Sequence, residues 1–238
     1  MIELRRREGR LLRIGHRGAA ALEPENTIAS LVAAVEHGCD LVEFDVLELD
    51  GALVLGHSPA EVPARPATLE DALAFLAQTA AGAHVDLKTP GVEQEVARAL
   101  REHGLLERSL VSSHRQTSLR ALEALEPALR LGLTYPEDRY GLSRRRLLAP
   151  LVGSGLVMMR AALVRRIGRM LAAARARAAV LHWQVVSRAV VERCHALEIP
   201  VLAWTAVTPE QVWKLDDLGV DGVIADDPRI FRGRWLMP

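Results

Sequence analysis

Short apolar runs alternate along this chain with longer segments that carry apolar residues at helical spacing. Such an alternation predicts a parallel sheet, because a helix usually returns the chain to the start of the next parallel strand. The predicted strands are residues 11–14, 41–46, 53–55, 85–88, 110–112, 129–133, 179–181, 201–205 and 222–226. We therefore expect an α/β protein.

The number of strand–helix units selects the architecture. Eight units of about thirty residues fit a closed (β/α)8 TIM barrel. An open, doubly wound sheet is the alternative, but the glycine fingerprint of its dinucleotide-binding turn is absent from the sequence. The 238 residues, half of them hydrophobic, suffice for one sizeable core. We expect a single barrel domain over residues 1–238.

Polar residues stand at the ends of the predicted strands. In a TIM barrel, the carboxyl ends of all strands meet on one face, where active sites are built. The residues at these ends are His16, Arg17, Glu43, Asp45, His57, Asp86, Lys88 and Trp204. We expect them to share one site, although His16 and Arg17 by themselves also fit an ordinary surface loop.

Three of these residues are carboxylates. Glu43 and Asp45 alternate along one strand, so their side chains point to the same side. Two carboxylates inside a barrel resist joint ionisation unless a cation lies between them. Together with Asp86 they offer oxygen ligands, which suit Mg²⁺ or Ca²⁺ better than zinc. The sequence therefore predicts a divalent metal site.

The other residues at the strand ends indicate chemistry on an anion. Arg17 and Lys88 supply positive charge beside the predicted metal site, and the donor fork of an arginine fits a phosphate. His16 and His57 titrate near neutral pH, so the pair can serve as general base and general acid. This combination predicts in-line displacement at phosphorus, which is phosphodiester cleavage.

The same residues form an ordered motif. His16-Arg17-Gly18, followed by Pro24-Glu25-Asn26-Thr27, resembles the opening signature of the glycerophosphodiester phosphodiesterase family, whose members are metal-dependent TIM-barrel enzymes. Further matches follow in the family's order across almost the whole chain: Glu43 and Asp45, His57, Asp86 with Lys88, Trp204-Thr205, and Gly222 to Pro228.

This resemblance implies a role for each residue. The implied roles are the acid–base pair for His16 and His57, the metal ligands for Glu43, Asp45 and Asp86, phosphate contacts for Arg17 and Lys88, and an apolar wall for glycerol for Trp204. The implied reaction releases an alcohol and sn-glycerol 3-phosphate. The substrate's own glycerol hydroxyl would be the nucleophile, and a cyclic phosphate the intermediate.

The sequence also departs from the family pattern. Ser58 stands where an Asp usually follows the second histidine, Asp86 replaces the usual Glu, and Val207 replaces a frequent Asn. Only 28 residues separate His57 from Asp86, so the insertion that many members carry there is nearly absent. Two alternatives stay open: a lipid phosphodiesterase of lysophospholipase D or sphingomyelinase D type, and a member that binds phosphoesters without turnover.

One long segment lacks acidic residues. Residues 139–191 hold eleven arginines and no Asp or Glu, and we expect two helices before the strand at 179. Within residues 163–174 the apolar side chains share one helix face, while Arg165, Arg166 and Arg169 share the other. An ordinary barrel helix explains this pattern. The alternative is a lid or a surface for anionic lipid, where each arginine gains about 1 kcal/mol.

Two sequence features bear on location. No apolar run approaches the roughly 20 residues of a membrane span. The charged start of the chain, with Glu3, Arg5, Arg6 and Arg7, is unlike a signal peptide. We expect a cytoplasmic protein whose partner is a small phosphodiester and not a nucleic acid.

Overall fold

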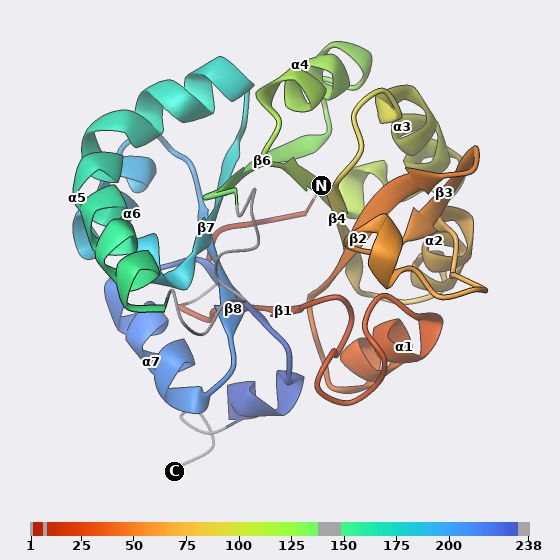
Figure 1. Ribbon diagram of the computed structural model, residues 1–238, viewed down its shortest axis with the longest axis horizontal. Coiled ribbons are helices and arrows are strands. Elements are labelled where there is room, and N and C mark those ends of the chain that lie inside the picture. The colour runs from red at the N-terminus through yellow and green to blue at the C-terminus, as the bar shows by residue number, and fades with distance from the viewer. Residues whose placement is uncertain (1, 7–8, 138–148, 233–238) are drawn as a thin grey trace.

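Within the described residues, eight parallel strands close into a barrel that helices surround (Figure 1). The computed structural model describes residues 2–6, 9–137 and 149–232. The barrel strands are β1 Leu12–Gly15, β2 Leu41–Leu49, β4 Gly82–Leu87, β5 Ser109–Ser113, β6 Arg130–Tyr135, β7 Ala178–His182, β8 Val201–Ala206 and β9 Gly222–Ala225. Because β1 pairs with both β2 and β9, the sheet has no open edge in the ring. The predicted TIM barrel is confirmed.

A hairpin extends from the barrel at β2. The chain turns at Asp50 and Gly51, which both adopt positive φ (51° and 83°), as a tight Asp-Gly turn requires. Strand β3 Ala52–Leu55 then returns antiparallel to β2. The predicted strand 53–55 is thus confirmed as the second arm of this hairpin, which lies outside the barrel ring. Its direction leads the chain back to the mouth of the barrel.

Helices cover the outside of the barrel. They are α1 Ile28–Glu36, α2 Leu69–Ala77, α3 Glu93–Glu102, α4 Gln116–Leu125, α5 Ala149–Ala174, α6 Arg188–His195 and α7 Pro209–Leu218. The side chains of Thr27, Thr68 and Thr208 each accept a hydrogen bond from the backbone N–H three residues later. These contacts satisfy backbone N–H groups that have no partner within the first turn of a helix.

A separate apolar cluster fills the amino-terminal end of the barrel interior. Its members from the strands include Leu12, Ile14, Leu110 and Leu202, and all of them are buried. Leu4, from the segment that precedes β1, joins this cluster and is 4% exposed. With this end packed by apolar side chains, the polar residues of the strands gather at the opposite end.

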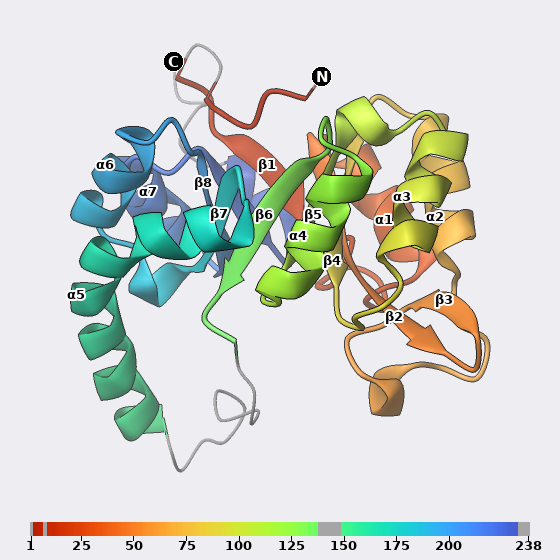
Figure 2. The same cartoon turned by 90° about the horizontal axis from the view of Figure 1, so that it is seen from above.

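The region after β6 differs from expectation. Instead of two helices, the described residues contain the single 26-residue helix α5, and residues 138–148 lie outside the described residues. Pro150 does not interrupt α5, because it lies in the first turn, where a missing N–H is tolerated. Figure 2 shows that the first turns of α5 project beyond the same end of the barrel as the β2–β3 hairpin, on the opposite flank.

The two faces of α5 match the predicted pattern. Leu163 and Ile167 are buried against the rest of the barrel, whereas Arg165, Arg166 and Arg169 are exposed. An amphipathic helix of this kind packs its apolar stripe on the strands. In the described part of the chain, no helix combines the length and the apolar character that crossing a bilayer requires.

Candidate active site

The loop after β1 is built for close packing. A Cβ atom on Gly15 would lie 2.3 Å from the carbonyl oxygen of Gly18, and Gly18 itself has a φ of 85°. Both positions therefore favour glycine. Between them, His16 and Arg17 are held at the carboxyl end of β1, with the His16 N–H bonded to the Ala225 carbonyl of β9.

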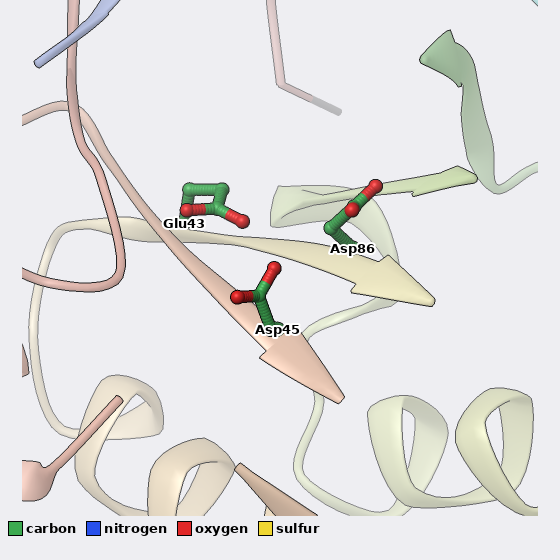
Figure 3. A group of neighbouring side chains, drawn as sticks. All are labelled: Glu43, Asp45 and Asp86. Carbon is green, nitrogen blue, oxygen red and sulfur yellow. The ribbon is translucent and has the colours of Figure 1, made fainter. Parts of the chain in front are cut away.

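Three carboxylates come together on two neighbouring strands. Glu43 and Asp45 lie on β2, and Asp86 lies on β4 directly beside Asp45 in the sheet register. All three side chains are buried, and each offers an oxygen within 4.8 Å of the other two (Figure 3). The structure therefore brings together the three residues predicted as metal ligands.

Two cationic side chains border this cluster. Lys88 Nζ lies 2.8 Å from Asp45 Oδ1 and also contacts Asp86. Arg17 Nε lies 3.0 Å from Asp45 Oδ2, and Arg17 Nη1 donates to Glu25. Both cations thus face carboxylates and stand next to the cavity in which an anion would meet them.

The negative charge of an ionised Glu43 is not fully compensated by the cations around the cluster. Burial, together with repulsion from Asp45, raises the pKa of Glu43 to about 7. Burial also opposes the ionisation of Asp45, but Lys88 and His57 hold the pKa of this carboxyl well below its ordinary range. A cation beside Glu43 would keep it ionised. Three carboxylate oxygens, together with this uncompensated negative charge, suit a hard divalent cation.

Each of the two candidate catalytic histidines has a carboxylate at its Nδ1 atom. His16 Nδ1 lies 2.6 Å from Asp226 Oδ1, just after β9. His57 Nδ1 lies 3.3 Å from Asp45 Oδ2. His57 reaches this position because the antiparallel arm β3 leads back to the barrel mouth, and not because a barrel strand ends there. The carboxylate beside the His57 imidazole is therefore Asp45, whereas the residue that follows His57 is Ser58 and not the usual Asp.

One cavity of about 360 Å³ unites the site. All eight residues predicted for the site line it: His16, Arg17, Glu43, Asp45, His57, Asp86, Lys88 and Trp204. Trp204 is fixed by a 3.2 Å hydrogen bond from its indole N–H to the Val180 carbonyl and by an edge-on contact with His182. Its ring forms part of the cavity wall opposite the carboxylates' strands.

Several further residues belong to the site besides the eight predicted ones. Asp226 belongs to the closing motif, but its contact with His16 is visible only in the fold. Ser112 and Thr134 donate hydrogen bonds to Asp86, and His84 contacts Ser112 beneath it. His114 and Glu137 pair at a distance of 3.0 Å on another part of the cavity lining. Serine and threonine at strand ends are too common for sequence to single them out.

The barrel and its site together define a class of protein. Buried carboxylates, paired histidines and cations at the carboxyl face of an eight-stranded barrel define a TIM-barrel hydrolase. The particular family follows from the sequence: residues 16–65 and 68–230 match the Glycerophosphoryl diester phosphodiesterase family. The chain belongs to this family of phosphoric diester hydrolases, and the resemblance seen in its motifs is confirmed.

Relatives with known names agree with this assignment. A glycerophosphodiester phosphodiesterase of Caldanaerobacter subterraneus subsp. tengcongensis is 28% identical in an alignment that covers 90% of this chain and 93% of the relative.

Solved structures share the fold. A glycerophosphodiester phosphodiesterase from Agrobacterium tumefaciens matches with a TM-score of 0.70 and 18% identity, over 93% of this chain and 99% of that one. An Oleispira antarctica phosphodiesterase, solved in complex with the product sn-glycerol-3-phosphate, matches with a TM-score of 0.68 and 23% identity. That match covers 91% of this chain and 93% of the other.

Proposed function

We propose that this protein hydrolyses glycerophosphodiesters to an alcohol and sn-glycerol 3-phosphate, with a divalent metal ion, Mg²⁺ or Ca²⁺, as cofactor. The observation that carries this proposal is the placement of two carboxylate-held histidines, His16 and His57, beside a buried carboxylate cluster. The product complex of the Oleispira antarctica relative supports the same reaction.

The two histidines exchange protons with the substrate. Both rings meet their carboxylate partners through Nδ1, which directs the Nε2 atoms to substrate. One imidazole removes the proton of the attacking glycerol hydroxyl, and the other donates a proton to the oxygen of the departing alcohol. The new P–O bond gives a cyclic phosphate as the bond to the alcohol breaks. Water then opens the cyclic phosphate with the two proton-transfer roles exchanged.

The residues around the phosphate supply positive charge. Glu43, Asp45 and Asp86 would hold the cation, which when bound adds positive charge at the phosphate oxygens. Arg17 and Lys88 line the cavity and donate hydrogen bonds to the phosphate oxygens. Trp204 provides an apolar wall against which the carbon skeleton of glycerol packs.

A turnover assay tests this function. Purified protein is incubated with glycerophosphocholine and Mg²⁺ or Ca²⁺, and the release of sn-glycerol 3-phosphate is measured. We expect product with metal and none in excess chelator. A lysolipid in a parallel reaction tests the acyl-chain alternative. If the protein binds glycerophosphocholine but forms no product with either Mg²⁺ or Ca²⁺, it is a non-catalytic binder instead.

A further inference from the structure

In each carboxylate of the cluster, one oxygen accepts hydrogen bonds from residues other than Lys88. The backbone N–H of Arg17 donates to Glu43 Oε2 at 2.8 Å. Asp45 Oδ2 accepts from the Asn26 amide at 3.2 Å and faces Arg17 Nε at 3.0 Å. Asn26 is itself buried and fixed, because its own Oδ1 accepts from the Asp45 backbone N–H. These contacts hold the two carboxyl groups of β2 in one orientation.

Asp86 is held most firmly. Ser112 Oγ donates to Asp86 Oδ1 at 2.6 Å, and Thr134 Oγ1 donates to the same oxygen at 3.0 Å. A carboxylate only accepts, so both hydroxyls give it their hydrogens. Ser112 Oγ can then only accept from His84 Nε2, which lies 2.9 Å away. The neutral imidazole must carry its proton on Nε2 to do so, and His84 is 1% exposed. This chain of hydrogen bonds fixes the orientation of the Asp86 carboxyl group.

The second oxygen of each carboxylate makes none of these bonds. Asp45 Oδ1 and Asp86 Oδ2 both contact Lys88 Nζ, which shows that positive charge already gathers there. The third such oxygen is Glu43 Oε1, since Oε2 accepts from the backbone N–H of Arg17. The cluster therefore offers a divalent cation one oxygen from each carboxylate, and at Asp45 and Asp86 this cation must displace the ammonium group of Lys88.

We propose that the cluster binds its cation through one oxygen of each carboxylate, that Ser112 and Thr134 enforce this at Asp86, and that the site therefore favours Mg²⁺ over Ca²⁺. Mg²⁺ takes six ligands and keeps several waters, so three single oxygens suit it. Ca²⁺ takes six to eight oxygens and often draws two from one carboxylate. Ser112 and Thr134 are thus positioning residues. The inference rests on the metal site of the proposed function and names the ion it selects.

Calorimetry on metal-free protein tests this inference without an activity assay. Mg²⁺ and Ca²⁺ are titrated separately into wild type and into the double variant Ser112→Ala with Thr134→Val. We expect wild type to bind Mg²⁺ more tightly than Ca²⁺. Loss of supporting bonds to a ligand typically costs about 10–100-fold in metal affinity, and we expect this cost for Mg²⁺. The affinity for Ca²⁺ should fall less, because Asp86 Oδ1 becomes available as a second ligand oxygen.

The chain offers a matched control. Ser109 lies at the start of β5, the strand that carries Ser112, and is fully buried, with no hydrogen-bond partner for its hydroxyl among the described residues. Ser109→Ala should change neither affinity. If the double variant does not fold, the single variant Thr134→Val gives the same test at a position nearer the surface.

Two results would overturn the inference. One is tighter binding of Ca²⁺ than of Mg²⁺ by wild type. The other is an unchanged ratio of the two affinities in the folded variants. Both leave the metal-dependent reaction intact, because metal still binds. Absence of heat and of thermal stabilisation with either ion would remove the metal site itself, and this inference with it.

Discussion

Asp226 Oδ1 lies 2.6 Å from His16 Nδ1, although the two residues are 210 positions apart in the chain. The contact joins the ends of β9 and β1, where the last and the first strand of the barrel pair. Burial by itself disfavours the charged imidazole, but the hydrogen bond to Asp226 and the charge of Glu43 raise the pKa of His16 above its ordinary value. The last strand therefore sets the proton affinity of a residue on the first.

Replacement of Asp226 by Asn should lower the pKa of His16, because burial remains while the carboxylate charge is lost. NMR titration of the imidazole measures this shift directly. Turnover should also fall, but by less than the about 10²–10⁴-fold that loss of a general acid or base costs. Asp227→Asn is the control, since Asp227 pairs with Arg229. An unshifted His16 pKa in the Asp226 variant would show that this carboxylate does not act on the imidazole.

Removal of either candidate catalytic histidine should stop most turnover. We expect His16→Ala and His57→Ala each to lower kcat by about 10²–10⁴-fold with little change in thermal stability. The double variant should be little worse than the worse single one, because the two side chains act as a unit. Steady-state kinetics on glycerophosphocholine provide the measurement. Near-normal turnover in one variant would exclude that histidine from the mechanism.

The stability of the metal-free protein should depend on pH through Glu43. Its pKa rises from 4.5 to about 7 on folding, so the folded state holds this proton more tightly than the unfolded chain. The stabilisation is complete below pH 4.5 and is lost as pH rises to about 7. Saturating Mg²⁺ should restore the melting temperature at pH 7, because it binds the ionised cluster only in the folded state.

Glu43→Gln provides the control for this pH dependence, since the amide does not titrate. Its metal-free melting temperature should vary less between these pH values than that of wild type, and Mg²⁺ should stabilise it less. If wild type and variant show the same pH profile and the same response to Mg²⁺, Glu43 is neither the titrating group nor a ligand.

Replacement of Lys88 by Met should separate metal binding from catalysis. The ammonium group contacts Asp45 and Asp86, so its removal should raise the affinity for a divalent cation. The phosphate should lose a cationic contact at the same time, so kcat/KM should fall. Calorimetry and kinetics on one preparation give both values. Lys214→Met is the matched control, because Lys214 is exposed and lies over Trp183. A loss of metal affinity in Lys88→Met would contradict the competition between ammonium and metal.

The exposed arginines of α5 should contribute to binding of anionic membranes. Replacement of Arg165, Arg166 and Arg169 by Gln should weaken salt-sensitive binding to phosphatidylserine vesicles without unfolding, because each arginine near such a surface gains about 1 kcal/mol. Vesicle sedimentation at low and at high salt measures this. Replacement of Arg98 and Arg101 by Gln is the control, since both face acidic partners. If wild type does not sediment with vesicles at low salt, these arginines are ordinary surface charge.

Much of the fold and of the site could be predicted from sequence. Alternation of apolar runs and helical periodicity identified the strands, and a TIM barrel brings every strand end to one face. Residues as distant as His16 and Trp204 could therefore be assigned to one site before any contact was known, and both line the cavity. The roles implied by resemblance for these residues remain predictions.

Other features were decided only by tertiary structure. The hairpin β2–β3 places His57 beside Asp45, and closure of the barrel places Asp226 beside His16. The single helix α5 also stands in the described residues where two helices were expected, and its buried side chains Leu163, Ile167 and Leu171 pack on the barrel.

The sequence by itself determined which residues reach the barrel mouth, because strand periodicity and the position of a strand end are local properties of the chain. The tertiary structure decided which side-chain atoms contact one another. Asp86 Oδ1 is occupied by Ser112 and Thr134 from two later strands, while Asp86 Oδ2 faces Lys88. Such pairings depend on the register between strands and on side-chain rotamers, which are fixed only when segments distant in sequence pack together.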